Sequence, residues 1–113
     1  MCSETTLNKI LKEVRNAYEK VYGDKLVKVV LYGSYARGDY DSESDIDIMG
    51  FVEDKRERVQ KDLKKVWNLC SDLEFENDLL ICQNAIPYEE FIKYKEVLPY
   101  YRNVEKEGVE ISA

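Results

Sequence analysis

The sequence contains no histidine among its 113 residues, and this absence excludes several kinds of site. The usual Ser-His-Asp and Cys-His nucleophile systems need an imidazole as the base, so this chain cannot form them. Zinc sites with histidine ligands are excluded for the same reason. Cysteine is also scarce, and Cys2, Cys70 and Cys82 form no Cys-x-x-Cys motif. Three scattered cysteines are typical of reduced thiols in a cytoplasmic protein rather than of a disulfide framework.

Long apolar runs are missing as well. No run approaches the roughly 18 apolar residues that a membrane-spanning helix needs, and the N-terminus lacks the apolar centre of a signal peptide. We therefore expect a cytoplasmic protein without membrane contact. The length favours a single domain over residues 1–113.

Acidic residues exceed basic ones, and they are unevenly placed. The chain has 17 basic and 23 acidic residues, which gives a net charge of −6. Residues 39–47 hold five acids and no base, so they contribute −5 and the remainder of the chain −1. This balance argues against a basic nucleic-acid-binding protein, and we expect no direct binding to nucleic acid. A polyanion such as a nucleotide would need a cation as mediator.

The apolar pattern predicts alternating helices and strands. Three- and four-residue steps predict helices over 7–22 and 54–71. Pro87 and Pro99 fit the starts of two shorter helices, in the first of which Phe91 and Ile92 would face inward. The predicted strands are 26–32, 45–52, 73–82 and 109–111, with a helical turn at 34–38 and a polar loop at 39–44. This order predicts an α/β (α+β) domain with a small mixed sheet.

Two aspartates on the second predicted strand suggest a metal site. Side chains alternate along a strand, so Asp45 and Asp47 would point to the same face. At about 4 Å and an effective dielectric near 20, their repulsion is on the order of 4 kcal/mol. A divalent cation would offset it, and Mg²⁺ commonly binds one or two carboxylates plus substrate phosphates. The alternative is a purely structural role, in which the two aspartates lie on a solvated strand edge and their charges oppose aggregation.

Gly33 and Ser34, at the end of the first strand, fit the phosphates of the same ligand. Glycine lets the backbone approach a phosphate, and the N–H groups that open a helical turn attract anions. Ser34 adds a hydroxyl, and Arg37 follows one turn later as a guanidinium that can brace phosphate oxygens. An ordinary strand-to-helix turn is the alternative for Gly33 and Ser34. An ion pair with Asp39 or Asp41 is the alternative for Arg37.

Two-metal phosphoryl transfer calls for a third carboxylate, which would complete the metal site and activate the attacking hydroxyl. The third predicted strand offers Glu74, Glu76 and Asp78 on one face. Asp78 precedes the apolar Leu-Leu-Ile-Cys segment, so we prefer it, with Glu76 as the second choice.

At these positions the sequence resembles a known family. The segment GSYARGDYDSESDID is similar to the G-S-x(10)-D-x-D signature of the DNA polymerase β-like nucleotidyltransferases. The short length resembles the minimal nucleotidyltransferases (MNT) that act as antitoxins of HEPN toxins. The resemblance covers most of the chain, and the C-terminal RNVEKEGVEI segment is similar to the end of many members.

The resemblance implies a role for each of these residues. Gly33, Ser34 and Arg37 would hold the triphosphate of ATP. Asp45 and Asp47 would bind two Mg²⁺ ions, with Asp78 as third ligand and catalytic group. AMP would pass to a hydroxyl, most readily a tyrosine of a cognate HEPN ribonuclease, with release of pyrophosphate. The part of the nucleotide and acceptor pocket that this short chain does not supply would come from that partner or from a second copy of the chain.

Two alternatives remain open from the sequence. The acceptor could be a small molecule such as an aminoglycoside. The chain could also be a non-catalytic antitoxin that neutralises its partner by forming a complex.

Overall fold

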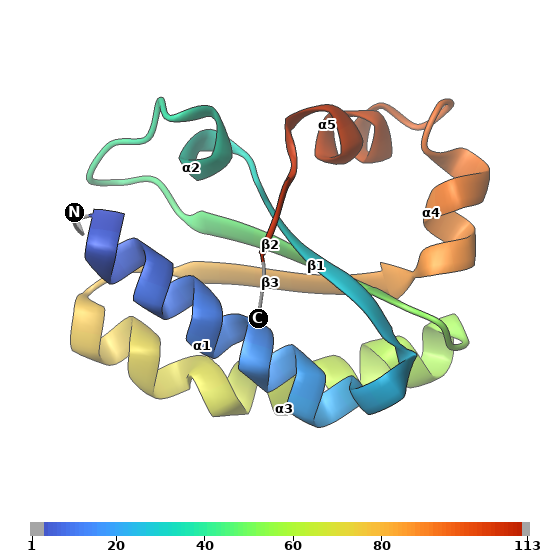
Figure 1. Cartoon of the computed structure of the whole chain (residues 1–113), viewed down its shortest axis with the longest axis horizontal. Coiled ribbons are helices and arrows are strands. Elements are labelled where there is room, and N and C mark those ends of the chain that lie inside the picture. Colours follow the sequence, from blue (N-terminus) through green and yellow to red (C-terminus); the bar gives the residue numbers. More distant parts are fainter. Residues whose placement is uncertain (1–3, 112–113) are drawn as a thin grey trace.

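The computed structural model describes residues 4–111, in which helices lie on both faces of a four-stranded sheet (Figure 1). The elements are α1 (Glu4–Tyr22), a 3-10 turn (Gly23–Lys25), β1 (Leu26–Tyr32), α2 (Ser34–Arg37), β2 (Ile46–Val52), α3 (Arg56–Asn77), β3 (Ile81–Pro87), α4 (Tyr88–Tyr94), α5 (Pro99–Glu107) and β4 (Val109–Glu110). None of the helices in this range is long and apolar enough to span a membrane.

The sheet is mixed, with the strand order β3-β2-β1-β4. β1 is antiparallel to both β2 and β4, whereas β2 and β3 run parallel and are joined through α3. In Figure 1, α1 and α3 cover one face of the sheet, while α2, α4 and α5 lie on the other side. The predicted mixed α/β fold is confirmed, and β1 has the predicted bounds.

Alternation along β2 divides the core between the two faces. Ile46 and Ile48 are fully buried in the larger cluster, which includes α1 and α3 residues. Met49 and Phe51 belong to the second cluster, under α4 and α5. Gly50 is required because the buried ring of Tyr18 occupies the space of a side chain there. The Tyr18 hydroxyl then donates to the Asn84 carbonyl oxygen at 2.8 Å.

The predicted third strand over 73–82 is wrong, because α3 continues to Asn77 and β3 starts at Ile81. The apolar spacing of Leu63, Val66 and Cys70 extends one further turn to Leu73, which packs against the larger cluster. Asp78 then ends the helix in a left-handed conformation (φ 50°). One smaller prediction also fails, because Ile92 is 46% exposed while Phe91 is buried.

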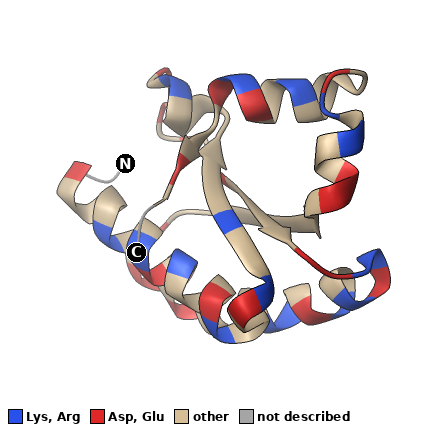
Figure 2. Cartoon of the chain, turned by 45° about the vertical axis from the view of Figure 1, so that its right-hand side comes forward, with Lys and Arg blue, Asp and Glu red and all other residues tan. Residues whose placement is uncertain are grey.

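α3 also protects the free edge of the sheet. β3 is an outer strand, so some of its carbonyl groups lack a partner strand. The Trp67 indole nitrogen donates to the Gln83 carbonyl at 2.9 Å, and the Gln60 amide donates to the Ala85 carbonyl at 2.6 Å. These bonds replace strand pairing at the edge. Along the first half of α3, up to Lys65, basic and acidic residues are mixed on the outer surface, as expected for a solvated helix face (Figure 2).

Candidate active site

The structure brings the glycine after β1 against an aspartate of β2. Gly33 has φ 77° and ψ −155°, a conformation that side chains rarely adopt. A Cβ added to Gly33 would collide with the Asp47 carboxylate. The glycine is therefore needed twice, for its backbone angles and for the close approach of Asp47. The motif residues that the sequence separates lie in direct contact.

Asp45 and Asp47 lie close to each other, as their spacing predicts. Asp47 is half-buried, and its pKa is raised, mainly by burial and then by the negative charge of Asp45. The carboxylates of both residues form no ion pair within residues 4–111. Two neighbouring carboxylates that have no ion-pair partner among the described residues are a donor set suited to a hard divalent cation.

Ser34 begins α2, the predicted helical turn. The amides of Ala36 and Arg37 donate to the Gly33 carbonyl at 3.1 and 3.0 Å, so the turn starts directly at the glycine that contacts Asp47. Tyr35 is buried and stacks on Tyr40, with ring centroids 4.2 Å apart. This stack holds the following acidic loop against α2.

Arg37 forms two ion pairs. Its Nε lies 3.1 Å from Asp39 Oδ2, and its Nη1 lies 2.6 Å from Glu107 Oε2 at the end of α5. The pair with Asp39 is one that the sequence suggests, whereas the link to α5 is not visible in the sequence. Arg37 remains exposed and its positive charge lowers the pKa of Asp47, so it lies near the carboxylate pair.

Asp78 lies at the end of α3 and not on a strand, so the strand argument for choosing it is wrong. Residues 4–111 contain no group of three acidic or cysteine side chains arranged to hold a metal ion. Asp78 and Asp45 nevertheless line one pocket of about 670 Å³, which Glu76 does not line. The role of Asp78 stays a prediction.

Sequence reasoning missed Cys82 as a neighbour of the carboxylates. It pairs with Asp47 in the β2–β3 register, and its thiol donates to Asp45 Oδ2 at 3.5 Å. Partial burial, followed by the charge of Asp45, raises the pKa of the Cys82 thiol to about 11. The contact could be found only after β3 is placed at Ile81–Pro87, since the register then puts Cys82 beside Asp47.

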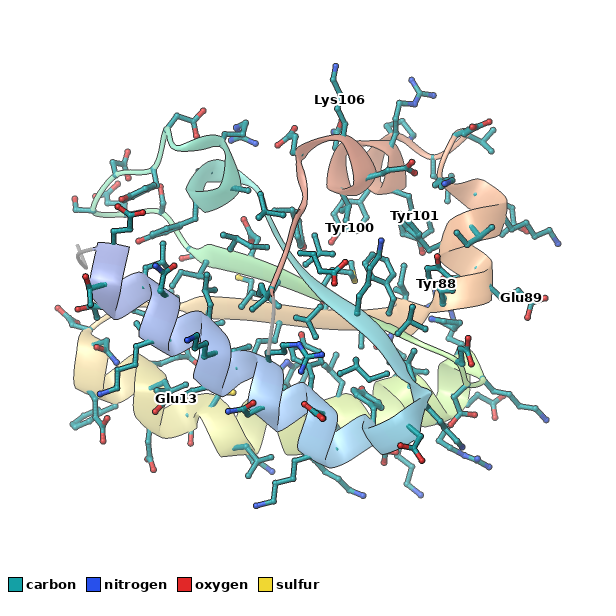
Figure 3. The ribbon with its side chains drawn as sticks, viewed as in Figure 1. Glu13, Tyr88, Glu89, Tyr100, Tyr101 and Lys106 are labelled. Atoms are coloured by element: carbon teal, nitrogen blue, oxygen red, sulfur yellow. The ribbon has the colours of Figure 1, made fainter. Side chains whose placement is uncertain are left out.

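A tyrosine pair lies next to the carboxylates and was also missed. Tyr32 is the β1 partner of Asp47, and its hydroxyl lies 2.6 Å from the Tyr100 hydroxyl of α5. The Asn84 amide lies 3.5 Å from the same Tyr32 hydroxyl. Figure 3 shows Tyr100 and Tyr101 pointing from α5 toward the sheet. α5 is thus anchored beside the site.

Known proteins resemble this chain in sequence and in fold. The family model of the nucleotidyltransferase domain matches residues 7–110. Two proteins of Methanocaldococcus jannaschii, named as candidate protein adenylyltransferases, are 37% identical over 102 residues and 40% identical over 101 residues. The first match covers 90% of this chain and 95% of the relative, and the second covers 88% and 92%.

Solved structures share the fold at lower sequence identity. A toxin–antitoxin structure with AMP-PNP has a TM-score of 0.52 at 19% identity, covering 99% of this chain and 74% of that chain. The toxin–antitoxin MntA-HpeT, in a variant with two aspartates changed to glutamate, has a TM-score of 0.53 at 18% identity, with the same coverages. The match over residues 7–110 and the two archaeal relatives show that this chain belongs to the nucleotidyltransferase domain family.

Proposed function

We propose that this nucleotidyltransferase moves AMP from ATP to a tyrosine of a partner toxin and so acts as an antitoxin. The contact between Gly33 and the Asp47 carboxylate carries the proposal, because it joins the expected phosphate turn to the expected metal ligands. The names of the two archaeal relatives support a protein acceptor. The toxin–antitoxin structures of the same fold support a toxin partner.

Asp45 and Asp47 would hold Mg²⁺ together with the triphosphate. Their neighbouring negative charges, which no ion pair among the described residues neutralises, and their oxygen donors fit this ion. Bound magnesium supplies positive charge for the α- and β-phosphate oxygens as negative charge develops on them. We propose two ions, as in other two-metal phosphoryl transfer sites.

The protein's own groups would bind and orient the reactants. The backbone at Gly33 and the Ser34 hydroxyl would hold the triphosphate, and Arg37 would leave Glu107 to contact it. The acceptor hydroxyl oxygen attacks the α-phosphorus, the bond to the bridging oxygen breaks, and pyrophosphate leaves. We assign the departing hydroxyl proton to Asp78, which shares a pocket with Asp45.

The partner is proposed to be a HEPN ribonuclease, on the resemblance of the sequence to the MNT antitoxins. To test this, the chain is incubated with ATP, Mg²⁺ and a candidate HEPN protein from the same genome, and the modified residue is located by mass spectrometry. We expect AMP on one tyrosine of the HEPN protein and none with Asp45→Asn/Asp47→Asn. Modification of another residue type would contradict the tyrosine assignment.

The same variant separates catalysis from complex formation. If modification silences the toxin, cells that carry Asp45→Asn/Asp47→Asn should lose protection although the two proteins still bind each other. Protection that persists in this variant without any AMP on the toxin would favour a non-catalytic antitoxin.

A further inference from the structure

A pocket next to Asp45 has a composition that the metal site does not explain. It lies between the loop that enters β2 and the end of α3, which are both at the left of Figure 1. Its volume is about 670 Å³. Four carboxylates line it, from Glu43, Asp45, Glu74 and Asp78, and no lysine or arginine does.

The charge of this pocket is uncompensated within residues 4–111. None of its four carboxylates takes part in an ion pair there. The last turn of α3 holds no basic residue, although the carbonyl end of a helix is itself partly negative. Cations stabilise such helix ends, so acids at this end cost stability. The helix end and the carboxylates therefore both favour a positively charged ligand.

Exposed apolar side chains stand in the same wall. Phe75 is 89% exposed and Leu80 is 61% exposed, and both line the pocket. Among the large apolar residues of the described chain, Phe75 has the highest exposed fraction. An aromatic face beside carboxylates can hold the stem or the guanidinium of a basic side chain. A metal ion alone would bind the carboxylates and would leave the apolar side chains of Phe75 and Leu80 exposed to water.

We propose that this pocket binds a basic segment of the acceptor protein that also carries apolar side chains, and that it thereby directs the acceptor tyrosine to Asp45. The inference rests on the proposed function in that the bound segment belongs to the acceptor. Cations bound at Asp45 leave Glu43 and Glu74 to attract lysine or arginine. Phe75 and Leu80 pack against the apolar side chains. Nucleic acid, a polyanion, is repelled by the same surface.

The test uses two short synthetic peptides that each contain one tyrosine. In the first, lysine and leucine flank the tyrosine, and in the second each lysine is replaced by glutamate. Binding is measured by fluorescence anisotropy without nucleotide, at low and at moderate salt. We expect the basic peptide to bind at least about tenfold more tightly than the acidic one, with an advantage that shrinks as salt rises.

Matched variants locate the binding. Glu43→Gln/Glu74→Gln should weaken the basic peptide about tenfold, because two carboxylates of the pocket lose their charge. The control Glu57→Gln/Asp72→Asn removes the same charge from exposed positions of α3 outside the pocket and should change binding less than twofold. Phe75→Ser should weaken the peptide about fivefold. Leu69→Ser, which is 46% exposed in the native chain and outside the pocket, should not.

Several results would overturn the proposal. Equal binding of both peptides would show that the acidic wall does not select a basic ligand. Equal weakening by the two charge-neutralising pairs of substitutions would leave only a non-specific effect of net charge. If spermidine displaced the basic peptide while Phe75→Ser had no effect, the occupant would be a small cation instead of a polypeptide. A second assay with ATP and Mg²⁺ follows AMP transfer to the same two peptides. AMP transfer with no preference for the basic peptide would contradict the docking surface, whereas binding of the basic peptide without any transfer would count against the proposed reaction alone.

Discussion

At the scale of single residues, the site depends on a glycine whose missing side chain is replaced by a carboxylate. Gly33 has a positive φ, and Asp47 fills the space beside it. The sequence shows both residues and their spacing, so the contact could be anticipated as a shared site. The direct collision that any larger residue would cause depends on backbone angles, which a sequence pattern does not contain.

Replacing Gly33 should therefore reduce activity by more than the strain of its backbone angles alone would cause, because the new side chain also displaces Asp47. Gly33→Ala places a side chain on backbone at φ 77° and ψ −155°, a region that is almost restricted to glycine, at about 1–3 kcal/mol, and also displaces the Asp47 carboxylate. Gly38→Ala is the matched control, because Gly38 has φ 86° and open space around it. We expect at least about 100-fold loss of AMP transfer for Gly33→Ala and little loss for Gly38→Ala, measured at equal folded fractions. Equal losses in the two variants would contradict the contact with Asp47.

The raised pKa of Asp47 has a consequence for stability. Since the native state holds the Asp47 proton more tightly than the unfolded state, stability falls as pH rises from the usual aspartate pKa through the raised one. At neutral pH without divalent cations, Asp47→Asn should thus raise Tm by a few degrees, on the order expected for a small domain. The gain should vanish below the usual pKa, while exposed Asp72→Asn should leave Tm unchanged in thermal scans. A lower Tm for Asp47→Asn at neutral pH would contradict this account.

At the scale of elements, the sequence predicts the helical turn after β1 and fails at the end of α3. The sequence predicts β1 with the observed bounds because an apolar, largely β-branched segment, interrupted only by Lys28, ends at Gly33. The segment after Cys70 alternates polar and apolar residues like a strand, yet Leu73 continues the helical stripe. The helix continues because Leu73 packs against the core, and the order of polar and apolar residues alone does not reveal that packing. The wrong bounds of the third strand placed Asp78 on a strand instead of at the end of α3. They also concealed that Cys82 lies beside Asp47 in the sheet.

The link between α2 and α5 gives a prediction for Arg37. If Arg37 must leave Glu107 to reach the triphosphate, Glu107→Gln should free it and lower the KM for ATP about two- to fivefold. Glu105→Gln is the control, because Glu105 pairs with Lys95 instead. Steady-state kinetics of AMP transfer at varied ATP would measure this. An unchanged or higher KM in Glu107→Gln would argue that the pair holds Arg37 in its active position.

At the scale of the whole molecule, the acidic composition and the proposed nucleotide substrate would require a cation between them. A net charge of −6 would repel ATP, and residues 39–47 hold most of that charge beside the proposed phosphate-binding turn. The sheet order places Asp47 of β2 between Tyr32 of β1 and Cys82 of β3. This setting is not visible in the sequence, because it depends on which strands are neighbours.

Magnesium should therefore control the stability and the nucleotide affinity of the whole chain. At a magnesium concentration ten times the dissociation constant, we expect about 1.4 kcal/mol of added stability. ATP should bind measurably only in its presence. Calorimetric unfolding with magnesium, with EDTA and with Asp45→Asn/Asp47→Asn would show this. ATP affinity that is unaltered in EDTA would contradict a metal-bridged site.

The most direct test of nucleotidyl transfer at Asp45 and Asp47 compares ATP labelled at the α-phosphate with ATP labelled at the γ-phosphate. Each is incubated with the chain, Mg²⁺ and the HEPN protein proposed as its partner, and the label on that protein is counted. The account predicts that only the α-label is transferred, and that Asp45→Asn/Asp47→Asn reduces it at least about 100-fold while Asp72→Asn does not. Transfer of the γ-label, or α-label transfer that survives in the double variant, would contradict it.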